Sequence, residues 1–448
     1  MFEILAGSDT IFALSTGVGK SAIAVVRISG PEARPILNII SDARLSPRRT
    51  ELATIFDPVS REAIDRGIVI WFPGPKSFTG EDCAELQVHG SRAVVAAIAR
   101  VLAALPNVRP AKPGEFTRRA LANGKLDLIG AEALVDLVDA ETEAQRRLAI
   151  LQQGGELQRF AERLREEIVD LVVDVETALD FSDELESDAA LLSGIEIRRL
   201  SIVKQLNLAL SNYAQGERIR DGLTVLIAGP PNAGKSSLLN ALARRDVAIV
   251  SELAGTTRDL IEVKLDLGGY PVNLIDTAGF RVTEDVVERE GLRRAAEKAK
   301  SADLLLWLTP SDEPSVSPPL SLDHLPTWPI YTKADLAVNS GFREAIDADG
   351  LSISVLTRDN VDLLIERLKV FAEENMSIEG SVMLANERQR QAIISAHEAI
   401  KAAGTPHLAI ELVAQELRRA CFALEVLLGK VGVDDILDRL FSRFCIGK

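Results

Sequence analysis

Short apolar runs alternate with amphipathic stretches over the first 120 residues. Residues 22–29 and 67–72 are mainly apolar runs of the kind found in buried strands, and residues 85–89 alternate apolar and polar side chains as a half-buried strand does. Residues 91–105 are rich in alanine, valine and leucine and are predicted to form a helix. Proline and glycine separate these segments. The pattern therefore predicts an N-terminal α/β domain.

From residue 121 the apolar positions recur every three or four residues, as they do on one face of a long helix. Two such helices are predicted over residues 126–151 and 157–179, with Gly154 and Gly155 forming the turn between them. A further helix is predicted over residues 195–213. This part of the chain is therefore expected to be a helical domain.

The helical pattern returns after about residue 376, and we expect these last helices to pack on the earlier ones. The segment between the two helical parts alternates apolar runs with loops and helices, as a parallel sheet requires. Its predicted strands are residues 223–228, 272–275, 303–308, 330–331 and 351–355. We therefore expect this segment to be a separate domain inserted into the helical one.

Composition and net charge limit the classes of function that this chain is expected to have. The 448 residues predict about three domains, and only 4% are aromatic, so aromatic platforms for single-stranded nucleic acid are not expected. A net charge of −15 argues against a broad basic face for nucleic acid. The sequence shows neither a secretory signal nor an apolar run near the roughly 20 residues that span a bilayer. The three cysteines form no CxxC pair, which indicates a reducing, cytoplasmic setting without a zinc site.

Residues 229–236, with the sequence GPPNAGKS, match the phosphate-binding pattern GxxxxGK[ST]. An apolar run precedes them and a helical pattern follows, a context that a chance glycine-rich turn would lack. The glycines would let backbone N–H groups surround the phosphates, while Lys235 neutralises the β/γ oxygens and the Ser236 hydroxyl binds Mg²⁺. The residues expected to bind nucleotide here are Asn232, Ala233, Gly234, Lys235, Ser236 and Ser237.

Three further motifs follow in the order that a GTPase requires. In Asp276-Thr277-Ala278-Gly279, Asp276 would hold Mg²⁺ through water and the Gly279 N–H would face the γ-phosphate. The stretch 255–259 is a switch candidate, with Thr257 as a second Mg²⁺ ligand. The last motif is Thr332-Lys333-Ala334-Asp335, whose Asp335 can accept both guanine N1–H and N2–H.

Threonine replaces the usual asparagine at position 332, which leaves part of the base contact open. The four motifs together indicate guanine nucleotide rather than ATP or a degenerate site. The sequence thus predicts an α/β plus all-α protein with a Ras-like P-loop G domain. Its predicted domains are residues 1–120 (N-terminal), 121–220 and 373–448 (the discontinuous helical domain), and 221–372 (the G domain).

The residue after the DTAG motif is Phe280, where Ras-like proteins carry a glutamine that orients the attacking water. Hydrolysis must therefore use another carboxylate or amide, or an external element. Glu284, Asp285 and Glu288 lie just beyond it. Their alternative interpretation is that they are solvated helix charges.

The motifs and their flanking segments closely resemble the MnmE (TrmE) family of tRNA-modifying GTPases, and the resemblance covers essentially the whole chain. In the N-terminal part it rests on residues 23–31 (IAVVRISGP), 78–82 (FTGED), 113–117 (PGEFT) and 123–128 (NGKLDL). In the G domain it rests on residues 231–237 (PNAGKSS), 254–259 (AGTTRD) and 287–289 (VER). The terminal FCIGK, residues 444–448, is a very specific match.

The resemblance implies a homodimer that acts with the flavoprotein MnmG (GidA) in a heterotetramer. Together they would add an aminomethyl or carboxymethylaminomethyl group to C5 of the wobble uridine of tRNA. The one-carbon unit would come from a tetrahydrofolate derivative, 5-formyl- or 5,10-methylene-tetrahydrofolate, bound at the N-terminal domain. By position, the family's folate contacts fall on Arg27, Glu85, Lys125 and Lys448, although Arg27 and Glu85 taken alone could equally form an internal salt bridge.

The resemblance also points to a potassium ion that substitutes for an arginine finger. Its ligands would be Asn232, Ser251, Leu253 and Thr256. Asn232 has an alternative role, which is to cap the loop through a backbone hydrogen bond. Ser251, Thr256, Thr257, Thr277, Ala278, Gly279 and Lys333 complete the expected GTP-binding set.

The expected catalytic residues are Glu288, Lys235 and Cys445. Glu288 matches the family's water-positioning acid, whereas Cys445 is either a nucleophile or a packed thiol. A ribosome-assembly or regulatory GTPase without covalent tRNA chemistry is the alternative function. The N-terminal motifs and the terminal CIGK favour tRNA modification. The sequence has no GxGxxG after a predicted strand, so a flavin step would need the partner protein.

Overall fold

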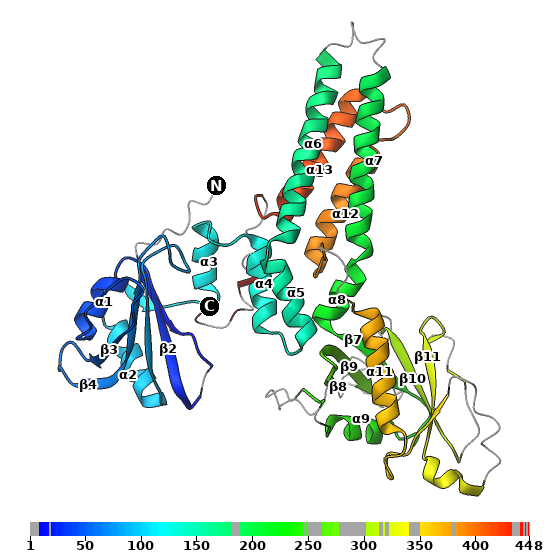
Figure 1. Cartoon of the computed structure of the whole chain (residues 1–448), viewed down its shortest axis with the longest axis horizontal. Coiled ribbons are helices and arrows are strands. Elements are labelled where there is room, and N and C mark those ends of the chain that lie inside the picture. Colours follow the sequence, from blue (N-terminus) through cyan, green and yellow to red (C-terminus); the bar gives the residue numbers. More distant parts are fainter. Residues whose placement is uncertain are drawn as a thin grey trace, which may run out of the picture. The chain divides into compact units, whose positions relative to one another are not determined.

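The computed structural model describes residues 9–17, 19–180, 189–245, 247–249, 262–276, 302–312, 317–318, 322–339, 350–377, 382–431, 440–441, 444 and 447. The chain forms two compact units. The first unit comprises Met1–Val135, Gln153–Val173 and Ala414–Lys448, and the second comprises Asp136–Gln152 and Asp174–Val413. In Figure 1 the chain is coloured along its sequence, which makes both discontinuous units traceable.

The first unit contains a six-stranded sheet in the order β3-β4-β5-β2-β1-β6. Its strands are β1 (Thr10–Leu14), β2 (Ser21–Ser29), β3 (Glu51–Phe56), β4 (Ala63–Phe72), β5 (Cys83–Gly90) and β6 (Val108–Pro110). All neighbours are antiparallel except β1 and β6. The helices α1 (Ala33–Ile40) and α2 (Arg92–Ala103) share one apolar core with the sheet.

The predicted elements of this part are confirmed: the predicted strands fall within β2, β4 and β5, and the predicted helix is α2. Ser91 caps α2 by accepting the Val94 N–H at 3.1 Å, which supplies a partner for one of the unpaired amides of the first turn. Strands β1, β3 and β6 were not predicted.

Helices complete the first unit. They are α3 (Glu115–Ala122), α4 (Leu128–Val138), α6 (Glu156–Asp180) and α13 (Ile410–Leu427). The last residues of α4 and α6 and the first residues of α13 belong to the second unit. An ion pair joins Arg165 of α6 to Glu425 of α13 at 2.7 Å. The aromatic rings of Phe441 and Phe444 cluster with Leu128 and Val135. The end of the chain therefore packs beside α4.

The helical part of the second unit contains α5 (Glu143–Gln153), α7 (Ala189–Ser211), α8 (Tyr213–Asp221) and α12 (Glu387–Ala402). α12 lies along α7 (Figure 1), and the buried Arg199 donates a hydrogen bond to the Ile400 carbonyl at 3.1 Å. Together with the ion pair between α6 and α13, this confirms that the last helices pack on the earlier ones.

The prediction of one helix over residues 126–151 is wrong. α4 ends at Val138 and α5 begins at Glu143. The Gln145 side chain accepts the backbone N–H groups of Glu141 and Thr142 at 2.9 and 3.0 Å, and the Thr142 hydroxyl lies 3.5 Å from the Gln145 N–H. These reciprocal contacts form a capping box that starts a new helix. The predicted helix over residues 195–213 is likewise divided at Asn212 between α7 and α8.

The second sheet has the order β12-β11-β10-β7-β9-β8, and all its pairs are parallel except β8 with β9. Its strands are β7 (Leu223–Ala228), β8 (Glu262–Leu267), β9 (Tyr270–Asp276), β10 (Leu304–Pro310), β11 (Thr327–Thr332) and β12 (Leu351–Ser352). The helices α9 (Lys235–Ala243) and α11 (Val361–Asn375) pack in its main core, and the short η2 (Ala334–Asn339) follows β11.

All five strands predicted for this sheet are present, although β12 is shorter than expected, and β8 was not predicted. The fold is therefore α/β plus all-α, with a P-loop G-type sheet. Because β7, β9, β10 and β11 are parallel, the segments that follow their carboxyl ends meet at one edge of the sheet. This edge carries the candidate nucleotide site.

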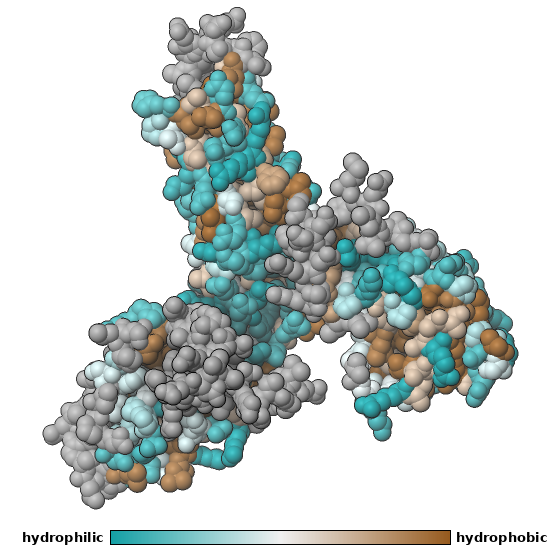
Figure 2. All heavy atoms as spheres, turned by 180° about the vertical axis from the view of Figure 1, so that it is seen from behind, coloured by the Kyte–Doolittle hydropathy of each residue, from teal (hydrophilic) through white to brown (hydrophobic). Residues whose placement is uncertain are grey.

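On the face that Figure 2 shows, hydrophobic residues are interspersed with hydrophilic ones along the helices. Exposed apolar side chains of α7 include Ile197 and Leu208, and scattered exposure of this kind is ordinary for a protein surface. Within the described ranges, no helix has both the length and the apolar character needed to cross a bilayer.

Candidate functional site

The loop between β7 and α9 has the backbone of a phosphate-binding loop. Asn232 and Gly234 adopt left-handed conformations, with φ of 62° and 83°. At Gly229 a Cβ would lie 2.2 Å from the Leu308 carbonyl oxygen, so only glycine fits there. α9 begins at Lys235, and the N–H groups of its first turn lack helical partners, as at any helix start. The expected strand–loop–helix context is therefore present, and it suits an anion.

Lys235 and Ser236 already contact oxygen atoms at this loop. The Lys235 ammonium donates to the carbonyls of Gly229 and Pro230 at 2.9 and 2.8 Å. The Ser236 hydroxyl donates to a carboxylate oxygen of Asp276 at 2.7 Å. Asp276 is buried at the end of β9. A hydroxyl and a carboxylate side by side are hard oxygen donors of the kind that Mg²⁺ prefers.

The base-recognition motif lies at the same edge of the sheet. The Thr332 hydroxyl donates to the Ala233 carbonyl at 2.8 Å, which joins the end of β11 to the phosphate-binding loop. The Ser354 hydroxyl donates to Asp335 Oδ1 at 2.5 Å. Lys333 has a left-handed backbone, and its ammonium lies 3.5 Å from a carboxylate oxygen of Asp312. The structure thus brings the phosphate-binding and base-recognition segments together.

Ser354 was not singled out from the sequence. It is fully buried just after β12, where its backbone N–H donates to the Asp359 carbonyl and its hydroxyl accepts the Thr357 N–H. The available signal was a serine between two apolar residues directly after the last strand, in the sequence ISV over residues 353–355. Such a side chain needs a hydrogen-bond partner, and Asp335 is that partner.

Several expected site residues lie outside the described part of the chain. In the G domain these are Ser251, Leu253, Thr256, Thr257, Thr277, Ala278, Gly279 and Glu288. At the end of the chain they are Cys445 and Lys448. Their expected roles remain predictions.

Arg27 and Glu85 occupy directly opposed positions on β2 and β5. The Arg27 guanidinium donates to Glu85 Oε1 from Nη2 at 3.1 Å and from Nε at 3.3 Å. The side chains are 23% and 20% exposed, and the guanidinium lies 5.3 and 5.9 Å from the ring centroids of Phe78 and Phe116. The two residues therefore form an internal salt bridge, but one that remains partly open and is flanked by aromatic rings.

The other two expected folate contacts, Lys125 and Lys448, have neighbouring residues that lie close to the segments carrying Arg27 and Phe78. The Lys125 side chain packs over Gly80, in the turn that also carries Phe78, since a Cβ at Gly80 would lie 3.3 Å from Lys125 Cε. Gly447 precedes Lys448, and its carbonyl accepts the Ser15 hydroxyl at 3.0 Å. Ser15 follows β1, which pairs with β2. The C-terminal end of the chain thus lies against the strand next to that of Arg27.

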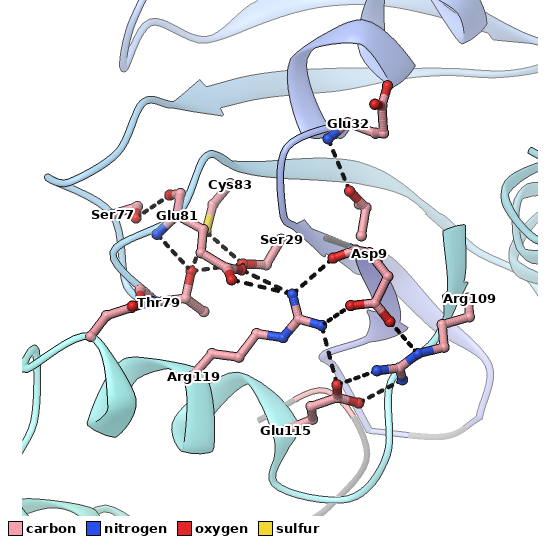
Figure 3. A network of polar contacts seen from close by, with 12 residues as sticks. Asp9, Ser29, Glu32, Ser77, Thr79, Glu81, Cys83, Arg109, Glu115 and Arg119 are labelled. Carbon is pink, nitrogen blue, oxygen red and sulfur yellow. Dashed lines mark hydrogen bonds and ion pairs between the residues drawn. The ribbon is translucent and has the colours of Figure 1, made fainter. Parts of the chain in front are cut away.

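A buried network of charged side chains lies in the N-terminal α/β part of the first unit (Figure 3). Arg119 is 1% exposed, and its guanidinium contacts carboxylate oxygens of Asp9, Glu81 and Glu115 at 2.9, 3.2 and 3.3 Å. Arg109 contacts Asp9 and Glu115, each at 2.6 Å. Glu81 and Glu115 belong to the FTGED and PGEFT segments, so these motifs also serve to build the domain core.

Charge pairing controls the ionisation of this network. Burial raises the pKa of Glu115, but the hydrogen bonds from Arg109 and from the Lys112 N–H outweigh burial, so the pKa lies below its ordinary value. For Asp9, burial is likewise outweighed by the hydrogen bond from Arg109 and by the charge of Arg119, and the pKa is again lowered. Both carboxylates are therefore ionised at neutral pH. Sequence reasoning missed this network because Asp9 and Arg119 are far apart in the chain.

Comparisons with known proteins agree with this geometry. A family model described as GTP-binding protein TrmE N-terminus matches residues 10–125, and one described as MnmE helical domain matches residues 128–445. The chain is 46% identical to the tRNA modification GTPase MnmE of Beijerinckia indica subsp. indica, over 98% of this chain and 96% of that protein. It is 47% identical to the tRNA modification GTPase MnmE of a Bradyrhizobium species, over 98% of this chain and 99% of that protein.

Proposed function

We propose, because the chain belongs to the MnmE family, that it is a GTPase that acts in tRNA modification. The observation that carries the GTPase assignment is the loop from Gly229 to Ser236. It joins the end of a strand to the start of a helix through a glycine-rich turn, and its Ser236 contacts Asp276. The identity of 46–47% over nearly the whole chain supports the tRNA assignment.

GTP and Mg²⁺ would be held at the carboxyl edge of the second sheet. The triphosphate would bind at residues 232–237. The Lys235 ammonium would then leave the Gly229 and Pro230 carbonyls for phosphate oxygens, which are stronger acceptors. Ser236 and Thr257 would hold Mg²⁺, which neutralises charge on the β- and γ-phosphates. Asp335, oriented by Ser354, would accept the guanine N–H groups.

Potassium is proposed as the second ion, held by Asn232 with Ser251, Leu253 and Thr256, while Glu288 positions the water. Asn232 is an exposed residue of the phosphate-binding loop, and its side chain carries an amide oxygen of the kind that can bind a cation. A monovalent cation would neutralise charge that develops on the phosphates. GTP turnover should be faster in KCl than in NaCl at equal ionic strength. Equal rates in the two salts, or an Asn232→Ala protein that keeps its potassium response, would contradict this assignment.

A reduced folate is proposed to bind beside the Arg27–Glu85 pair. A folate offers a carboxylate for a cation and a ring donor edge for a carboxylate, and the partly exposed pair with Phe78 and Phe116 provides both charges next to apolar rings. Lys125 and Lys448 would add positive charge. Arg27→Ala should weaken binding of 5-formyl-tetrahydrofolate at least about tenfold in calorimetry. GTP affinity serves as the internal control and should not change.

The chain is proposed to act in the cytoplasm as a homodimer with the flavoprotein MnmG in a heterotetramer, adding an aminomethyl-type group to C5 of the wobble uridine. Mass spectrometry of tRNA nucleosides from a strain lacking the chain tests this directly. The modified uridine should disappear, return with the wild-type chain, and stay absent with Lys235→Ala. Modification of tRNA by the purified chain alone would contradict the need for a partner.

A further inference from the structure

Thr332 stands where two parts of the nucleotide site meet. It is the last residue of β11 and is only 3% exposed. Its hydroxyl donates to the carbonyl of Ala233, which is itself fully buried in the phosphate-binding loop. The Thr332 carbonyl accepts the Ser311 N–H at 2.8 Å, so the backbone is held as well. The threonine therefore has one well-defined orientation.

The chemistry of a hydroxyl limits what this residue does for a bound base. A threonine has a single O–H proton, and here that proton is engaged by the Ala233 carbonyl. An asparagine carries two amide protons, one for the carbonyl and another for an acceptor on the base, such as N7 of a purine. With its proton engaged, the threonine oxygen can only accept, and N7 is also only an acceptor.

We propose that Thr332 is a positioning residue that ties the base-recognition segment to the phosphate-binding loop, and that this protein recognises guanine without a hydrogen bond from position 332 to N7. Recognition then depends on Asp335, whose carboxylate accepts the Ser354 hydroxyl. The inference rests on the proposed GTP binding and deepens it, because it names which edge of the base is read.

The proposal predicts which purine nucleotides the protein distinguishes. Asp335 would contact N1–H and the N2 amino group, so loss of the N2 amino group should matter. Replacement of N7 by a C–H group should not. An analogue such as 7-deaza-GTP should therefore bind like GTP, whereas inosine triphosphate should bind more weakly.

The test measures affinities of the full-length chain for GTP, 7-deaza-GTP and inosine triphosphate by calorimetry. The wild-type protein should bind GTP and 7-deaza-GTP within about twofold of each other, and inosine triphosphate at least about tenfold more weakly. Thr332→Asn should gain a preference for GTP over 7-deaza-GTP of about fivefold or more, because its second amide proton reaches N7.

Two matched variants separate positioning from folding. Thr332→Ser keeps the hydroxyl and should retain the wild-type affinities. Thr332→Val keeps the shape but leaves the Ala233 carbonyl unpaired, and should weaken GTP and 7-deaza-GTP equally, by about fivefold or more. A wild-type preference for GTP over 7-deaza-GTP of tenfold, or wild-type affinities in Thr332→Val, would overturn the inference. Absence of any guanine nucleotide binding by the wild-type chain would instead overturn the proposed function.

Discussion

Replacing Arg119 with methionine tests whether the buried network holds the N-terminal domain together. Methionine keeps most of the length and apolar volume of the side chain but removes the guanidinium. In the wild-type protein that group contacts the carboxylates of Asp9, Glu81 and Glu115 (Figure 3). The substitution therefore leaves three carboxylates with fewer partners in a buried setting.

The structure sets the size of the effect. Removing one partner of a buried ion pair costs about 3–5 kcal/mol of folding free energy. Here Arg109 still contacts Asp9 and Glu115, and the Ser29 hydroxyl still donates to Glu81 at 2.7 Å. Because these partners remain, we expect the lower end, about 3 kcal/mol. Arg100→Met is the matched control: Arg100 is exposed on α2, and its loss should cost about 0.5 kcal/mol or less.

Hydrogen exchange of the β1 and β2 amides in the full-length chain measures the difference, since these strands report opening of this domain. The pH dependence provides a second check. The lowered pKa of Glu115 contributes stability above its unfolded pKa of about 4.3, which is lost as the pH falls through the folded value. The difference between Arg119→Met and wild type should therefore shrink below about pH 4. A cost equal to that of Arg100→Met at pH 7 would refute the reasoning.

Three further outcomes are expected. Gly229→Ala should reduce the melting temperature and abolish nucleotide binding, because its Cβ would lie 2.2 Å from the Leu308 carbonyl; a protein that binds GTP normally would contradict this. Ser354→Ala should weaken GTP binding roughly tenfold in calorimetry, since Asp335 loses a charge-assisted hydrogen bond. Burial raises the pKa of Cys421 to about 11, so its labelling by iodoacetamide, followed by mass spectrometry, should be slow at pH 8 and still rise above pH 10; a plateau below pH 9 would show an accessible thiolate.

The strands of the second sheet were predictable because burial on both faces makes them apolar runs, as in β7. β8 went unpredicted even though its sequence, EVKLDL, alternates polar and apolar residues as an edge strand does. The break between α4 and α5 could also have been predicted, since Thr142 and Gln145 have the spacing of a capping box, which indicates a helix start. In both places a short local signal, the alternation in β8 and the capping box before α5, marks an element that a longer apolar periodicity does not show.

The two halves of the candidate sites differed in how far the sequence could predict them. The phosphate-binding loop is a local structure, since its glycines, Lys235 and Ser236 lie within eight consecutive residues. The partners Ser354 of Asp335 and Asp9 of Arg119 are remote in sequence, 19 and 110 positions away. No local spacing encodes such pairs. For Arg27 and Glu85, the strand register and the ion pair show that the two residues contact each other, whereas folate binding stays a prediction.

Among the described residues, the hydroxyl groups of Ser236, Thr332 and Ser354 connect the loops of the nucleotide site. The Ser236 hydroxyl donates its proton to Asp276, and its oxygen keeps lone pairs for the proposed Mg²⁺, whereas the Lys235 ammonium must exchange its two carbonyl contacts for phosphate oxygens. Thr332 and Ser354, in contrast, hold Ala233 and Asp335 by contacts that guanine recognition retains. The phosphate end of the site thus reorganises on binding, whereas the base end is already in place. Because a preorganised group loses little conformational freedom on binding, base recognition contributes to affinity at small entropic cost, and the rearrangement is concentrated at the end where hydrolysis occurs.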